Sequence, residues 1–179
     1  MDSTTPPADG SLARRPTTAN SWYSPIGLAI SFLISGDETQ GQFSQLQITA
    51  RHGAGPARHV HSREDETLTV LAGAVVVQVG DATTTLHPGD TVFLPRGVPH
   101  TYQVITPQAT FLGTIGPAGF ENFFRTIAEP AVAPGLPDGP SVAPDPQRIA
   151  ALLGGFGVTV VGPPLRLDGV RFTPAKPLT

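Results

Sequence analysis

Two histidines and a glutamate lie close together in the segment HVHSREDE. Only Val60 separates His59 from His61, so an extended strand would place both imidazoles on the same face. The intervening residues SRED are enough for a tight reversal that brings Glu66 back beside the histidines. We therefore expect the three side chains to meet at one site.

A third histidine follows in the segment LPRGVPHTYQV. Prolines and a glycine just before His100 favour a turn, which would set this histidine at the start of a new strand. Histidine and carboxylate ligands suit a divalent transition metal such as Fe, Ni, Co, Mn, Cu or Zn. The chain has no cysteine, so any metal must be held by such residues. Open coordination positions would admit a substrate or dioxygen.

Two other carboxylates flank the candidate glutamate. A shift of register would bring Glu64 or Asp65 to the metal instead, but Glu66 has the same strand parity as Leu68 and Val70, and we therefore favour it. Tyr102 has the parity of His100. It either points into the cavity and donates a hydrogen bond to substrate or Glu66, as a catalytic residue would, or packs its ring in the core with its hydroxyl at the rim.

The elements that must position these residues are short strands. From 27 to 115 the chain is rich in Val, Ile, Thr, Leu and Phe and is interrupted by turn signals such as SGDETQG, VGDAT and HPGD. The segment 67–95 predicts hairpins with turns at Ala72–Ala74 and Gly80–Ala82, followed by a turn at Pro88–Asp90. The prediction is an all-β fold, a small antiparallel barrel or jelly roll.

Helical periodicity occurs in two places. Phe120, Phe123, Phe124 and Ile127 predict an amphipathic helix that packs on the barrel and ends before Pro130. Farther on, DPQRIAALLGG predicts a short helix that Asp145 caps and Gly154 stops. Its apolar stripe and the following GVTVVG are expected to dock on the barrel or on a neighbouring subunit.

Composition limits the partners. Charged residues make up only 14% of the chain and the net charge is -3, so we expect no nucleic acid partner. The longest apolar run, GLAISFLI, is too short to span a bilayer, and the N-terminus has no apolar core of a secretory signal, so we expect a cytoplasmic protein without membrane contact. His52 and His87 stand at turns, where a solvated histidine is the ordinary case.

The spacing of these residues resembles the two motifs of the cupin superfamily. The first motif, G(X)5HXH(X)3–4E(X)6G, is matched by Gly53, His59, His61, Glu66 and Gly73. The second, G(X)5PXG(X)2H(X)3N, is matched by Gly89, Pro95, Gly97 and His100, but Val104 replaces the final Asn. The resemblance implies a single-domain cupin whose metal is bound by His59, His61, Glu66 and His100.

A narrower resemblance rests on HVHSREDE, PHTYQV and GPAGFENFF, which are similar to the bacterial single-cupin quercetin dioxygenases. This resemblance implies that Glu66 both binds the metal and takes the proton of a substrate hydroxyl. The substrate would be a flavonol or a similar small oxygenated aromatic or polyketide-like molecule. Two other functions stay open: a metal-dependent isomerase, cyclase or lyase, and a cupin that binds a small molecule without catalysis.

For domain organisation we expect a flexible arm over 1–20 and a cupin barrel with its closing helix over 21–129. A Pro-rich connector and a C-terminal extension with the short helix would then occupy 130–179. The run Val75–Val77 is apolar on both faces, which predicts a strand covered on both sides. A homodimer is one way to cover it.

Overall fold

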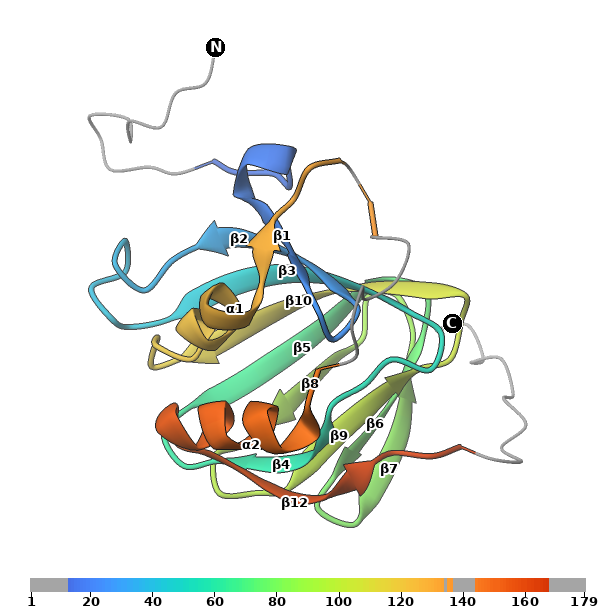
Figure 1. Cartoon of the computed structure of the whole chain (residues 1–179). Coiled ribbons are helices and arrows are strands. Elements are labelled where there is room, and N and C mark those ends of the chain that lie inside the picture. The colour runs from blue at the N-terminus through green and yellow to red at the C-terminus, as the bar shows by residue number, and fades with distance from the viewer. Residues whose placement is uncertain (1–12, 134, 137–143, 168–179) are drawn as a thin grey trace.

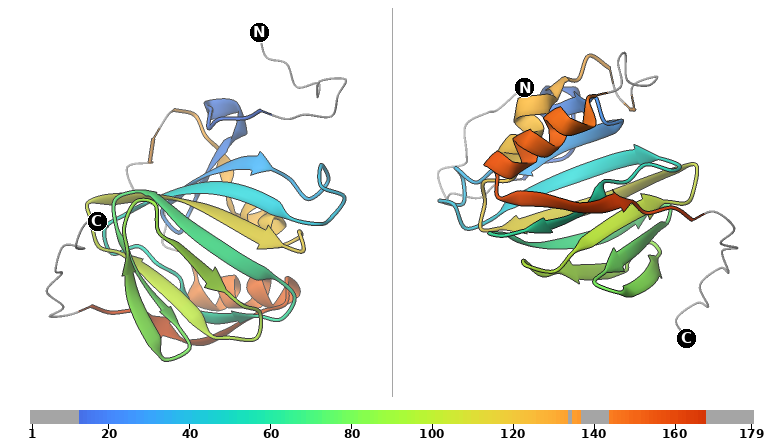
Figure 2. Two further views of the ribbon diagram at one scale, coloured as in Figure 1. Left: turned by 180° about the vertical axis from the view of Figure 1, so that it is seen from behind. Right: turned by 60° about the horizontal axis from the view of Figure 1, so that its bottom comes forward.

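The computed structural model describes residues 13–133, 135–136 and 144–167. Two antiparallel sheets face each other and enclose the apolar core, and two short helices lie along one side of the pair (Figures 1 and 2). The predicted all-β antiparallel fold with a few peripheral helices is confirmed. Among the described residues, no helix is long and apolar enough to cross a membrane.

The strands divide seven to five between the sheets. In spatial order, the larger sheet contains β11 (Glu129–Pro130), β1 (Ser21–Ser24), β2 (Leu28–Ile34), β3 (Ser44–Arg51), β10 (Gln108–Gly116), β5 (Asp65–Ala72) and β8 (Thr91–Leu94). The smaller sheet contains β12 (Val158–Pro164), β4 (Ala57–His61), β9 (His100–Val104), β6 (Val75–Val79) and β7 (Ala82–Leu86).

Alternation of side chains explains why these segments are strands. In β3, Leu46, Ile48 and Ala50 are buried, whereas the residues between them are more accessible. Phe111 of β10 and Val77 of β6 extend the same core from the two sheets. Such a period of two buries one face of each strand, and burial of apolar surface supplies the main driving force for folding.

One predicted hairpin is wrong. The turn at Ala72–Ala74 exists, but it joins β5 of the larger sheet to β6 of the smaller one, so these strands do not pair. Gly73 has a φ of 76°, and a Cβ there would collide with the backbone oxygen of Gln108, so the crossover requires glycine. The predicted hairpin at Gly80–Ala82 is confirmed, because β6 pairs with β7.

Both predicted helices are present. Helix α1 (Glu121–Ile127) buries Phe123 and Phe124, and α2 (Pro146–Gly155) starts at the Asp145 cap, whose side chain accepts a hydrogen bond from the Gln147 amide at 2.9 Å. The predicted stop at Gly154 is wrong: the helix continues through Gly155. The left-handed residue that redirects the chain is Gly157, with a φ of 79°.

The chain on either side of the predicted barrel also contacts it. After α2, β12 pairs antiparallel with β4, so the expected docking on the barrel is observed. Before β1, a 3-10 helix, η1 (Thr18–Asn20), follows Arg14, which forms an ion pair with Glu38. The domain boundaries stay predictions, since residues 1–12, 137–143 and 168–179 of the expected arm, connector and extension lie outside the described residues.

The run Val75–Val77 is buried on both faces within the single chain, with exposed fractions of 3% or less. The predicted two-sided cover is therefore confirmed without a second subunit, and the homodimer stays a prediction.

Candidate metal centre

The candidate ligands come from three strands and from both sheets. β4 supplies His59 and His61, and β9 supplies His100, which is the direct partner of His59 in the ladder. Glu66 reaches the same place from β5 in the facing sheet. Residues distant in sequence therefore meet between the two sheets.

The side chains lie close enough to share one cation. The ligand atoms of His59, His61 and His100 all lie within 4.8 Å of one another. One carboxylate oxygen of Glu66 is 3.7 Å from His61 Nε2, and the other is 3.4 Å from His100 Nε2. Donor atoms about 3 Å apart are typical of ligands at roughly 2.1 Å from one metal ion.

Hydrogen bonds at Nδ1 leave the Nε2 atoms free for a metal. His59 Nδ1 donates to the Ala57 carbonyl at 2.8 Å, and His100 Nδ1 donates to the Val98 carbonyl at 3.1 Å. A carbonyl oxygen can only accept, so the proton lies on Nδ1 and the Nε2 lone pair is available. The Nε2 atoms of His61 and His100 are buried without a hydrogen-bond partner among the described residues. A shared metal ion would satisfy them, so this residue set fits one.

The electrostatics also favour the protonation states that a metal needs. Burial and the neighbouring His100 lower the pKa of His59 to about 4, so its imidazole is neutral at pH 7. Burial raises the pKa of Glu66, but the close approach of His100 and the other nearby imidazoles outweigh that effect and lower the pKa. Neutral imidazoles and an ionised carboxylate are the forms that bind metal ions.

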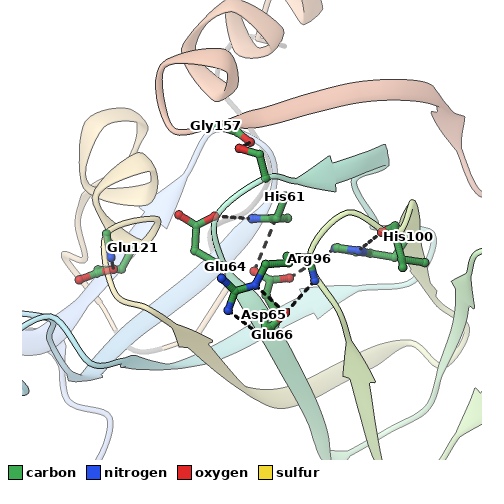
Figure 3. A network of polar contacts seen from close by, with 11 residues as sticks. His61, Glu64, Asp65, Glu66, Arg96, His100, Glu121 and Gly157 are labelled. Atoms are coloured by element: carbon green, nitrogen blue, oxygen red, sulfur yellow. Dashed lines mark hydrogen bonds and ion pairs between the residues drawn. The ribbon is translucent and has the colours of Figure 1, made fainter.

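The two flanking carboxylates have other partners (Figure 3). Asp65 turns away from the histidines and pairs with Arg96 at 2.7 Å. Glu64 is only 4% exposed and lies 3.2 Å from Nδ1 of His61, on the side of the ring opposite Glu66. Neither takes the place of Glu66 beside the Nε2 atoms.

Tyr102 lies in the wall of the cavity above these residues. Its ring packs edge to face against Phe111, with centroids 5.1 Å apart. Burial and the charge of Glu66 raise its pKa, so the hydroxyl keeps its proton and can donate. Among the described residues, no hydrogen bond joins this hydroxyl to Glu66. The packed ring agrees with the second alternative that the sequence left open, and the catalytic role of Tyr102 stays a prediction.

A cavity of about 380 Å³ opens onto this centre. His59, Glu66, Thr67, His100 and Tyr102 are the polar or titratable residues of its lining, and the rest is apolar. No lysine or arginine of the described chain lines it. The walls include aromatic and aliphatic side chains from α1, from the residue that precedes it and from α2: Phe120, Phe123, Phe124, Ile149, Ala150 and Leu153.

Sequence reasoning missed two parts of this arrangement. Glu64 stands in a polar turn, where no periodicity indicates that one carboxylate folds inward. The stripe of α2 predicted docking, and Ile149 and Leu153 do face the barrel, but nothing in the pattern indicated that they would line the cavity. His52 is exposed and His87 is half-buried, and neither belongs to the histidine group.

Residues 46–112, which include all four candidate ligands, match the family model described as a cupin domain. The part of the chain that carries the candidate ligands is therefore similar to a cupin domain. An RmlC-like cupin from Shewanella frigidimarina has the same fold, with a TM-score of 0.53 and 22% identity over 63% of this chain and 96% of that one.

Two curated relatives are quercetin 2,3-dioxygenases. The protein from Bacillus subtilis is 29% identical over 92 residues, which cover 51% of this chain and 27% of the relative. The protein from Aspergillus japonicus is 30% identical over 100 residues, which cover 52% of this chain and 29% of the relative. The matched cupin region thus spans little more than a quarter of either dioxygenase.

Proposed function

We propose that this protein is a divalent-metal-dependent dioxygenase of the quercetinase type, acting on a flavonol or a similar small oxygenated aromatic molecule. The observation that carries the proposal is an apolar, partly aromatic cavity lined by His59, His100 and Glu66, with the buried His61 in the same group of candidate ligands. The similarity of the cupin region to two quercetin 2,3-dioxygenases supports the same reaction class.

The metal would be held by His59, His61, Glu66 and His100. Such an ion supplies Lewis acidity, which stabilises the oxyanion of an enol or phenol once its proton has left. The metal's identity does not follow from the ligand set, because first-row divalent ions share these ligands.

Glu66 is the proposed proton acceptor. Its lowered pKa keeps the carboxylate ionised at neutral pH, and it lies at the floor of the cavity, where a substrate hydroxyl would arrive. Loss of that proton makes the substrate electron-rich, which is the property that reaction with dioxygen requires. Tyr102, which lines the same cavity, would donate a hydrogen bond to a second oxygen of the substrate.

The cavity walls favour a neutral aromatic substrate. A phosphate or polycarboxylate would enter without a lysine or arginine in the described lining to balance its charge. A flat aromatic molecule would instead contact the phenylalanines of α1 and the aliphatic residues of α2. A volume of about 380 Å³ lies within the usual range for small-molecule sites, roughly 300–1,000 Å³.

The test is oxygen uptake by protein reconstituted separately with Fe, Ni, Co and Mn, using a panel of flavonols. We expect one dioxygen consumed per flavonol lost with at least one metal, and no uptake in His59→Ala. Failure of every metal and flavonol would overturn the dioxygenase proposal. Turnover of a substrate under strict anaerobiosis would point instead to an isomerase, cyclase or lyase built on the same residues.

A further inference from the structure

Glu64 is buried, although the two residues before it in the same turn are exposed. The turn between β4 and β5 consists of polar residues, and Ser62 and Arg63 face solvent. Glu64 alone folds inward, to 4% exposure. Burial of a carboxylate costs free energy unless a specific partner compensates for it.

That partner is the imidazole of His61. Glu64 Oε2 accepts a hydrogen bond from His61 Nδ1 at 3.2 Å, and the ring is fully buried. Glu66 lies at the other edge of the same ring, 3.7 Å from Nε2. A neutral imidazole has one N–H, so it can donate to only one of the two carboxylates. With the proton on Nδ1 toward Glu64, the Nε2 lone pair faces the metal position beside Glu66.

The other two histidines are oriented differently. His59 and His100 each donate from Nδ1 to the backbone carbonyl two residues earlier. Only His61 has a carboxylate as its Nδ1 acceptor. A charged acceptor makes a stronger hydrogen bond than a carbonyl and increases the basicity of the far nitrogen, so a metal ligand gains more from it.

The turn that carries Glu64 is held on both sides. The backbone of Ser62 donates to the Gly157 carbonyl at 3.0 Å, and its hydroxyl donates to the same oxygen at 2.7 Å. On the other side, Asp65 accepts hydrogen bonds from the Arg96 backbone at 2.8 Å and from its guanidinium at 2.7 Å. The Glu64 side chain therefore projects from a backbone that is fixed before and after it.

We propose that Glu64 is a positioning residue that fixes the tautomer and orientation of His61 for metal binding. This inference rests on the proposed metal site but not on the proposed reaction. It gives the buried turn carboxylate a role separate from that of Glu66: Glu66 contacts the metal position, whereas Glu64 acts only through the imidazole.

The test measures Co²⁺ affinity by competition with a chromophoric chelator, together with the visible absorption of bound Co²⁺. We expect Glu64→Ala to weaken Co²⁺ binding by about 10- to 100-fold, as is typical for loss of a partner behind a ligating histidine. Glu64→Gln keeps an acceptor oxygen without the charge, so we expect a smaller loss and a shifted absorption band. It also covers the case in which the alanine variant does not fold.

Glu38→Gln is the matched control. It makes the same substitution at a carboxylate that pairs with Arg14 and plays no part in the turn, so we expect parent-like Co²⁺ affinity and absorption. Equal affinity and identical spectra in parent and Glu64→Gln would overturn the inference, as would an equal effect of Glu38→Gln. Because no substrate is present, these results are independent of the oxygen-uptake test. Parent protein that binds no Co²⁺ would overturn the metal site itself.

Discussion

Glu66 is the residue on which the proposed chemistry depends most directly. Substitution by Gln keeps the side-chain volume but removes the base, so kcat for flavonol oxidation is expected to fall by about 10²- to 10⁴-fold. The measurement is oxygen uptake per bound metal, with metal content determined in the same sample. A kcat per metal within threefold of the parent would show that another group accepts the proton.

Tyr102→Phe separates the two features of that side chain. The ring contact with Phe111 is retained, so the free energy of unfolding is expected to stay within about 1 kcal/mol of the parent. If the hydroxyl binds substrate, KM for the flavonol rises by about tenfold with folding unchanged. Unchanged KM and kcat would assign Tyr102 to packing alone.

His59 predicts a pH dependence for the metal-free protein. Its folded pKa, about 4, lies below its ordinary value of 6.5, so the unfolded chain binds the proton more tightly. The contribution of the neutral His59 side chain to the free energy of unfolding is therefore fully present above pH 6.5, and it is lost as the pH falls from 6.5 toward 4. We expect the free energy of unfolding in urea to decrease by about 2 kcal/mol between pH 7 and pH 5.

His59→Gln is the control for this window, because it removes the titrating group. Glu38 and Asp65, whose pKa values are both lowered to about 2, lose their contributions only at more acid pH. The same pH dependence in parent and variant would contradict the assignment to His59.

At the scale of elements, α2 offers a matched pair of leucines. Leu152 and Leu153 are adjacent and both partly buried against the core, but only Leu153 lines the cavity. Leu153→Ala and Leu152→Ala are each expected to lower the free energy of unfolding by about 1–2 kcal/mol. Only Leu153→Ala should raise KM for the flavonol, by roughly tenfold, because it removes apolar contact with substrate. Equal changes in KM in both variants would contradict the inference that Leu153 of α2 contacts the substrate.

Strands and helices could be predicted from the sequence wherever the residues of a single segment were sufficient to indicate them. The β-rich composition and turn signals of 27–115 predicted its strands, and the i, i+3, i+4 spacing of Phe120, Phe123 and Phe124 predicted α1. The partner of a strand is a nonlocal property, so the sequence predicts a hairpin at Gly73 although the turn there connects strands of different sheets. The pairing of β12 with β4 likewise depends on residues far apart in the chain.

In the candidate site, too, local patterns could be predicted from the sequence, whereas an arrangement that depends on distant residues could not. Strand parity brought His59 and His61 together, and the motif spacing added Glu66 and His100, all of which the structure places in one cluster. The inward fold of Glu64 could not be predicted, since it depends on how Ser62 and Asp65 hold the turn from opposite sides.

For the whole molecule, metal binding is expected to join the two sheets, because the proposed ligands come from both. Co²⁺ at a thousandfold excess over its Kd should raise the free energy of unfolding by about 4 kcal/mol. Amide exchange should slow most in the ligand-bearing strands β4 and β9 of one sheet and β5 of the other, and least at the distant edge formed by β1 and β11. Uniform protection, or the same protection in His100→Ala, would contradict a site shared between the sheets.

The pairing of β12 with β4 has a consequence for biosynthesis. β4, which carries two of the proposed ligands, leaves the ribosome long before β12, its neighbour on one side. Until β12 arrives, the nascent chain presents β4 as an open strand edge with two histidines, available both to stray metal ions and to other unfinished chains. Completion of the five-stranded sheet would then determine when, during translation, the site becomes selective.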